Sequence, residues 1–243
     1  MKSVVNWSTF CSVAAFLLAS CADPPQYSNL PIIEFDNIIY KNTTDADSLI
    51  ITVKFRDGDG DLGIDPYELN PPFNPRFYFR LADGQPTIAK DQPLITYLTK
   101  RTKPGYDTLP PFIKPYSCIN WEITTNTSGK FDTLYFQLNN NHYNIFVDYF
   151  IKNNNGSFTK FDFQKEFCTT YNGRFPILSK DLSQKTPLDG SIRYSMVSTA
   201  NGFLYQFCIK TLKLAVTIKD RTLNKSNTVE TQEFTLQSIK KSG

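Results

Sequence analysis

The feature that most constrains the fold of this 243-residue chain is a series of short segments rich in β-branched and aromatic residues. Such side chains favour strands, and the Gly, Pro, Asn and Asp residues between the segments favour turns. No amphipathic pattern long enough for a helix of about ten residues interrupts the series. The expected strands are residues 32–40, 48–55, 76–81, 120–124, 133–138, 143–151, 191–197, 211–218 and 229–236.

This pattern predicts an all-β protein, and specifically an antiparallel, immunoglobulin-like β-sandwich with long loop insertions. The insertions are expected at residues 84–115, which are rich in proline, and at residues 167–187, which have no clear periodicity. The 20 Phe and 13 Tyr residues are sufficient for a large core. We expect one sandwich domain over residues 31–243, and the sequence leaves open whether it divides into two lobes.

The N-terminal segment has the features of a bacterial lipoprotein signal peptide. Lys2 supplies a positive start, and the apolar run over residues 10–18 is too short to cross a bilayer. The sequence Leu17-Leu18-Ala19-Ser20-Cys21 then resembles a lipobox. We therefore expect residues 1–20 to be removed, Cys21 to carry acyl chains that anchor the protein to a membrane, and residues 21–30 to form an extended tether.

The charge distribution argues against nucleic acid as a partner. The formal net charge of +3 falls to +2 without residues 1–20, because Lys2 is the only charged residue among them. The remaining basic residues are scattered along the chain and form no stripe or cluster that would follow a phosphate backbone.

Three cysteines remain in the expected mature domain, namely Cys118, Cys168 and Cys208. Because the number is odd, at most one disulfide forms within the chain in an oxidising envelope compartment. The spacing does not say which pair forms, and the alternative is that all three are small buried apolar side chains. A zinc site is not indicated, because there is no CxxC motif and His142 is the only histidine.

The sharpest chemical signal is the acidic loop, residues 57–68, which directly follows an expected strand. Its carboxylates have the ligand spacing of an EF-hand loop, although Leu62 occupies the position of the turn glycine and a strand excludes the EF-hand helix pair. The alternative is a solvated acidic turn, but closely spaced aspartates repel one another without a counter-ion. We predict a structural calcium ion, with the first three residues favoured among the candidate ligands Asp57, Asp59, Asp61, Asp65 and Glu68.

A further acidic residue, Asp220, lies in the polar turn between the last two expected strands. In an immunoglobulin-like sandwich the second and the penultimate strand end at the same pole, so Asp220 could approach the acidic loop and share its ion. The alternative, which we favour, is that Asp220 caps its own turn and pairs with Arg221 or solvent.

Several motifs together resemble a family of uncharacterised surface lipoproteins of Bacteroidota. The resemblance implies an outer-membrane lipoprotein with immunoglobulin-like strand order and no assigned activity. The acidic tag that follows the cysteine in surface-exposed members is reduced here to Asp23, so both the periplasmic and the surface face remain open. Besides the lipobox, the resemblance is carried by residues 55–63, 144–150, 174–178, 187–192 and 218–229.

The sequence favours a non-catalytic binding or assembly module over an enzyme. His142 lies in an Asn-rich turn, and no nucleophile elbow or phosphate-binding glycine loop is present. The expected partners are the membrane, through the lipid anchor, and a glycan or an outer-membrane protein. Trp121, Tyr106 and Tyr116 are candidate platforms for sugar rings. The alternative function is an envelope hydrolase with a glycosidase-like pair of carboxylates.

Overall fold

The computed structural model describes residues 25–113, 116–125 and 129–241. The predicted signal peptide and Cys21 therefore lie outside the described residues. The described chain is mostly strand, arranged in three antiparallel sheets with α-helices of five or six residues. None of its helices is both long enough and apolar enough to cross a membrane. The all-β, sandwich-like fold predicted from the sequence is confirmed.

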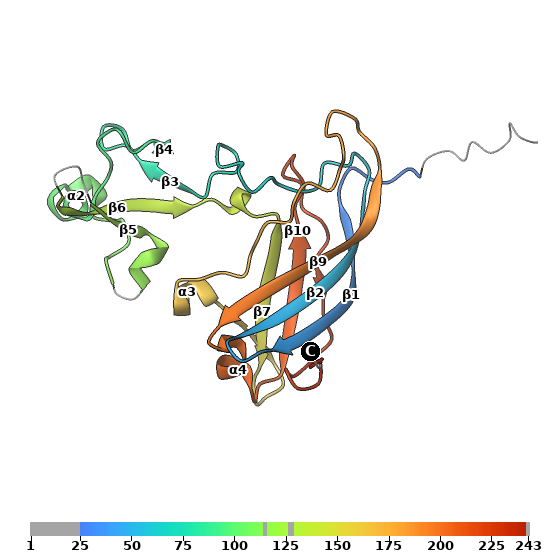
Figure 1. The fold of residues 1–243 in the computed structure, drawn as a ribbon. Helices are drawn as coiled ribbons and strands as arrows, with labels where there is room; N and C mark the ends of the chain where they lie inside the picture. Colours follow the sequence, from blue (N-terminus) through green and yellow to red (C-terminus); the bar gives the residue numbers. More distant parts are fainter. Residues whose placement is uncertain (1–24, 114–115, 126–128, 242–243) are drawn as a thin grey trace, which may run out of the picture.

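Two of the sheets form the sandwich (Figure 1). The first contains β1 (Ile32–Asn42), β2 (Ala46–Asp57) and β9 (Leu188–Thr199), in the order β1-β2-β9. The second has the order β11-β10-β7-β8, from β7 (Ile145–Lys152), β8 (Phe158–Phe161), β10 (Leu212–Ile218) and β11 (Val229–Glu230). If only the strands of the sandwich are counted, in chain order, the first, second and fifth (β1, β2 and β9) share one sheet, as in immunoglobulin-like sandwiches.

The core between the two sheets comes from alternate residues of their strands. Ile51 and Val53 of β2 face Leu214 and Val216 of β10, and all four side chains have at most 1% of their surface exposed. Side chains of a strand alternate between its two faces, so the apolar residues at every second position of β2 produce one buried face. This alternation is the pattern that made β2 recognisable in the sequence.

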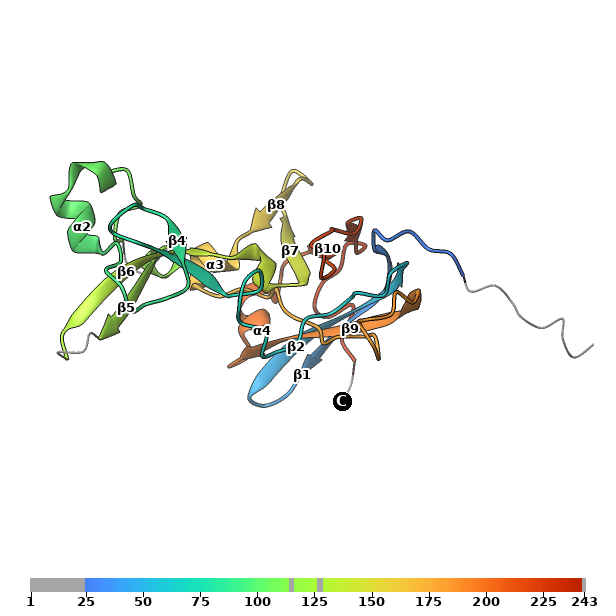
Figure 2. The same cartoon turned by 90° about the horizontal axis from the view of Figure 1, so that it is seen from above.

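The third sheet builds a separate lobe, which we call the outer lobe (residues 75–138). Its strands have the order β4-β3-β6-β5 and are β3 (Arg76–Phe79), β4 (Pro86–Thr87), β5 (Trp121–Thr125) and β6 (Phe131–Leu138). The helical segments α2 (Tyr97–Thr102), η1 (Pro104–Tyr106) and η2 (Tyr116–Ile119) lie in the same lobe. It has hydrophobic clusters of its own and projects sideways from the sandwich (Figures 1 and 2). The chain therefore divides into two lobes.

The outer lobe is inserted between β2 and β7. The segment that leads into the lobe and the segment that leads out of it are the two crossings, and hydrogen bonds join them at one place, which we call the neck. The Asn139 side-chain amide donates hydrogen bonds to the carbonyl oxygens of Pro72 (2.7 Å) and Asn74 (2.8 Å). The Asn139 backbone N–H donates to the carbonyl of Pro75 at 3.0 Å. A short helix, η3 (Asn140–His142), follows directly and leads into β7.

A disulfide joins the outer lobe to the sandwich. Cys118, in η2, is bonded to Cys168, which ends α3 (Phe163–Phe167), with 5.9 Å between the two Cα atoms. Cys208, which follows α4 (Gly202–Phe207), is a free and exposed thiol. The prediction of at most one intrachain disulfide is consistent with this arrangement, and the structure identifies the pair that the spacing left open.

The expected last strand, residues 229–236, is shorter than predicted. Only Val229 and Glu230 form β11, because the Thr231 hydroxyl accepts the Leu214 N–H at 3.0 Å and takes the place of a backbone partner. Pairing resumes at Phe234, which exchanges two backbone hydrogen bonds with Leu212, at 2.7 and 2.9 Å. The final segment is therefore an irregular edge.

Candidate metal centre

The acidic loop begins at Asp57, the last residue of β2. Other segments approach its glycines so closely that no side chain fits there. A Cβ on Gly58 would lie 2.3 Å from the carbonyl oxygen of Tyr27, and a Cβ on Gly60 would lie 2.2 Å from that of Thr186. Gly60 also has φ +69°, a conformation that glycine adopts without strain. The tether and the segment before β9 therefore enclose the loop and bury its carboxylates.

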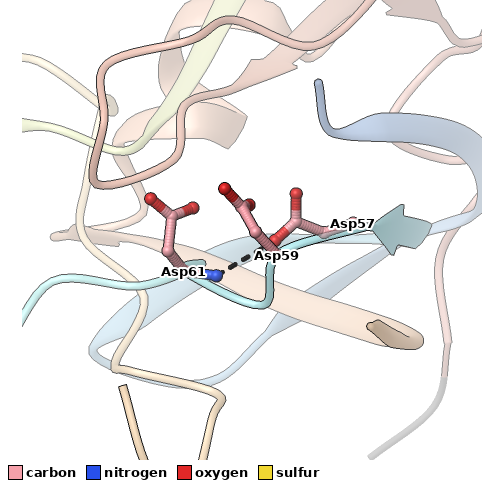
Figure 3. A group of neighbouring side chains, drawn as sticks. All are labelled: Asp57, Asp59 and Asp61. Carbon is pink, nitrogen blue, oxygen red and sulfur yellow. Dashed lines mark hydrogen bonds between the residues drawn. The ribbon is translucent and has the colours of Figure 1, made fainter. Parts of the chain in front are cut away.

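Three carboxylates of this loop converge, as Figure 3 shows. One oxygen each from Asp57, Asp59 and Asp61 lies within 4.8 Å of the others. Asp57 has no exposed surface, and only 9% of the Asp59 side chain is exposed. The Oδ2 atom of Asp57 accepts the Asp61 backbone N–H at 3.1 Å, but the Oδ1 atoms of all three residues are buried and have no hydrogen-bond partner among the described residues. Buried polar atoms are nearly always paired, so three unpaired acceptors at one place are a suitable arrangement for binding a cation.

The charges of the cluster are poorly compensated. Burial raises the pKa of Asp57 to about 7, and the negative charges of Asp59, Asp61 and Asp220 act in the same direction. Burial also raises the pKa of Asp61, again with help from Asp220 and Asp59. The Lys185 ammonium lies 3.7 Å from Asp59, but this lysine is 78% exposed, so water screens its contribution.

These residues fit a hard divalent cation. Calcium takes six to eight oxygen ligands in flexible geometry, and carboxylates are the ligands it prefers. The cluster contains neither histidine nor cysteine, so it lacks the nitrogen and sulfur atoms that zinc and copper favour. Asp57, Asp59 and Asp61 would supply three oxygens, and the remaining ligands would come from backbone carbonyls or water.

The structure does not bring the other two candidate ligands into this cluster. Asp65 accepts the backbone N–H of Tyr67 at 2.8 Å through its own side chain. Glu68 forms a two-point ion pair with Arg221, at 2.7 and 2.5 Å, which lowers the pKa of Glu68. Glu68 also accepts the Asp65 N–H at 2.9 Å. The second half of the loop therefore binds the turn after β10 and does not complete an EF-hand-like ligand set.

Asp220 is not among the three clustered carboxylates, so the structure favours the alternative in which it caps its own turn. Its carboxylate caps its own turn by accepting from the Asn224 backbone N–H (2.7 Å), the Asn224 side-chain amide (2.9 Å) and the Thr222 hydroxyl (3.0 Å). The same turn docks on the acidic loop, since the Thr222 N–H donates to Asp61 Oδ2 at 3.1 Å. The prediction that β2 and β10 end at one pole is thus confirmed. Arg221, however, pairs with Glu68 and not with Asp220.

The aromatic residues proposed as sugar platforms are placed differently from the expectation. Trp121 is only 3% exposed, packs in the core of the outer lobe and donates its indole N–H to the carbonyl of Pro110, so its proposed role as a platform was wrong. Tyr106 is half-buried, and its hydroxyl donates to the carbonyl of Leu81. The Tyr116 side chain lies outside what the structure describes.

Sequence reasoning missed a pocket of about 190 Å³ between α3 and α4. Two of its lining residues, Phe167 and Tyr205, are 53% and 88% exposed. In a chain with 20 Phe and 13 Tyr residues, the few aromatics that remain at the surface have no local signature. The pocket carries no ionisable side chain apart from its tyrosines and is lined by Phe163, Phe167, Thr169, Tyr171, Ser198, Gly202, Tyr205 and Gln206.

Comparisons with protein-family models, with curated proteins and with solved structures found no match to this chain.

Proposed function

We propose that this protein is a lipid-anchored envelope protein that acts as a non-catalytic binding or assembly module, stabilised by a calcium ion at the acidic loop. The observation that carries the proposal is the set of three buried, unpaired Oδ1 atoms of Asp57, Asp59 and Asp61. A cation at this point would bind the end of β2 and, through the contacts of Asp61, the turn after β10. Its role would then be to hold the sandwich together.

Burial of the same carboxylates argues against the hydrolase alternative. A pKa of about 7 would suit Asp57 as a general acid, because such groups work best near the operating pH. A general acid must also reach its substrate, and Asp57 has no exposed surface. The histidine, His142, lies in η3 at the neck, where its Nδ1 atom is hydrogen-bonded to the backbone carbonyl of Phe73 at 2.9 Å.

The binding role is supported by the pocket between α3 and α4. Figure 1 shows α4 at the pole of the sandwich opposite the acidic loop and α3 at the side of the sandwich. Phe167 and Tyr205 offer exposed aromatic surface there, and Gln206 and Ser198 add an amide and a hydroxyl group. Aromatic faces combined with uncharged polar groups suit a glycan or a side chain of an outer-membrane protein.

The anchor would hold the acidic-loop pole near the membrane. The Gly58 N–H donates to the carbonyl of Ser28 at 2.8 Å, so the tether joins the folded domain at this loop. Cys21 precedes Ser28 by only a few residues, and an extended chain spans at most about 3.6 Å per residue. An acylated Cys21 would therefore leave the pocket at the opposite pole directed away from the bilayer.

Calcium-dependent thermal melting of the protein lacking residues 1–21 tests the proposal. We expect millimolar calcium to raise the melting temperature by several degrees, a chelator to reverse the shift, and the Asp59→Asn/Asp61→Asn variant to show none. The exposed residue Asp107, changed to Asn, serves as the control for the loss of a carboxylate charge. A wild-type melting curve unchanged by millimolar calcium would reject the site, because an ion that binds only the folded state must stabilise it.

The anchor and the binding role need their own measurements. Mass spectrometry of the native protein should find Cys21 as an acylated N-terminus, and an intact leader would refute the lipoprotein assignment. A glycan array and a pull-down from solubilised outer membranes should show retention that Tyr205→Ala abolishes. Trp121→Phe, in the core of the outer lobe, should leave this retention unchanged.

A further inference from the structure

β9 forms an open edge of the first sheet. Among the strands that the structure describes, it pairs with β2 alone, over its whole length, Leu188–Thr199. Within the described ranges, no backbone hydrogen bond joins its outer edge to another segment. The opposite edge, β1, is covered instead, because Tyr40 exchanges backbone hydrogen bonds with Ile239 and Lys241. An unpaired strand edge is a template for pairing with another chain.

Apart from its two charged residues, Asp189 and Arg193, the edge lacks the usual features that prevent such pairing. Exposed edge strands are commonly short, charged, or interrupted by proline or a bulge. β9 has 12 residues, and its pairing with β2 runs without a register shift. Its sequence contains neither proline nor lysine, and Gly190 near its start is exposed. The strand is therefore long, regular and accessible from its outer side.

Two unpaired charges on β9 are complementary to each other. Asp189 and Arg193 are exposed and four residues apart, so they lie on the same face of the strand. Neither forms an ion pair or a side-chain hydrogen bond within the described residues. Arg56, which stands beside Asp189 across the ladder, is bonded to Glu34. Both charges are thus available to a partner.

We propose that the outer edge of β9 pairs with β9 of a second copy of this chain, in an antiparallel, two-fold arrangement centred on Ser191. In this register, Asp189 stands opposite Arg193 of the second copy, and the symmetry repeats the pair. Residues 188–194 of each copy share the ladder, and the first sheet continues from one copy into the other. The interface is independent of the calcium ion.

Charge reversal tests this register, with sedimentation velocity of the mature protein (residues 21–243) over a wide range of concentrations. Asp189→Arg and Arg193→Asp each place like charges opposite one another, and each should weaken the dimer about tenfold or more. The double variant restores opposite charges and should restore dimerisation. Asp107→Arg makes the same charge change at an exposed site in the outer lobe and should have no effect.

Cysteine cross-linking tests the geometry independently. Ser191→Cys, in a chain that lacks residues 1–21 and carries Cys208→Ser, should form an intermolecular disulfide with oxidised glutathione as the electron acceptor. Ser195→Cys lies on the same strand but far from the two-fold axis, so it should remain uncross-linked. Monomers at every concentration, single reversals that do not weaken the dimer, a double variant that fails to restore it, or efficient cross-linking at position 195 would each overturn the proposal.

Discussion

Replacing Asp57 with Asn should stabilise the protein without calcium and have little net effect on stability with calcium. In the metal-free protein, burial and three neighbouring carboxylates raise the Asp57 pKa from 3.8 to about 7. A raised carboxyl pKa means that the folded state disfavours the charged form, so stability falls as the pH rises from about 4 to about 7. One pKa unit corresponds to 1.36 kcal/mol, which makes the penalty about 4 kcal/mol at pH 8.

Asn removes this charge and keeps an oxygen that can accept the Asp61 N–H. Without calcium, Asp57→Asn should therefore stabilise the protein by up to about 4 kcal/mol, or raise the melting temperature by about 10 °C. With calcium at about 1,000 times its dissociation constant, the wild type gains about 4.1 kcal/mol from binding, a figure that already includes relief of the repulsion, whereas the variant gains little. The gap between the two proteins should then close.

Differential scanning calorimetry at pH 8, with chelator and with calcium, measures both effects. Asp107→Asn removes an exposed carboxylate from the outer lobe and should leave both melting temperatures unchanged within about 1 °C. If Asp57→Asn lowers the melting temperature in chelator, the wild-type carboxylate is stabilised by its protein neighbours. The inference from unpaired oxygens to a cation would then be refuted.

Three further substitutions test other parts of the fold. Cys118→Ser with Cys168→Ser should lower the free energy of unfolding in denaturant by about 4 kcal/mol, because the disulfide closes a loop of 50 residues, whereas Cys208→Ser should have no effect. Arg221→Gln removes the ion pair between the turn after β10 and the acidic loop, and because both partners are partly exposed the cost in chemical unfolding should be only about 1 kcal/mol. Trp121→Ala should destabilise the outer lobe by about 3–5 kcal/mol, seen as an earlier loss of near-ultraviolet circular dichroism.

The sandwich strands could be predicted because their signal is local. β2 alternates buried side chains with partly buried or exposed ones over much of its length, so its apolar residues recur at the period of a strand. The last strand was overestimated because the Thr231 side chain replaces a backbone partner, which no propensity reveals. The outer lobe was not predicted as a unit, since its strands have the same local pattern as those of the sandwich and only long-range pairing separates them.

The candidate site also has a part that follows from local sequence and a part that depends on long-range contacts. Asp57, Asp59 and Asp61 are neighbours on a glycine-rich turn, so their convergence follows from spacing within a few residues. The fate of Glu68 depends on Arg221, which lies 153 residues away in the sequence, and spacing within the loop contains no information about it. The prediction that Trp121 is a platform for sugar rings was wrong for a similar reason, because its burial depends on packing against residues contributed by several segments of the outer lobe.

The neck at Asn139 has a consequence for how such a protein can diversify. Because both crossings meet at one asparagine side chain, the sequence between them begins and ends at nearly the same point in space. A segment with adjacent ends can be exchanged, enlarged or deleted by recombination while the surrounding strands keep their register. The disulfide between Cys118, in this segment, and Cys168, in the sandwich, is the main additional connection that such an exchange would have to preserve or discard. We therefore expect homologous chains to differ most in length and sequence between the two crossings, on a common frame.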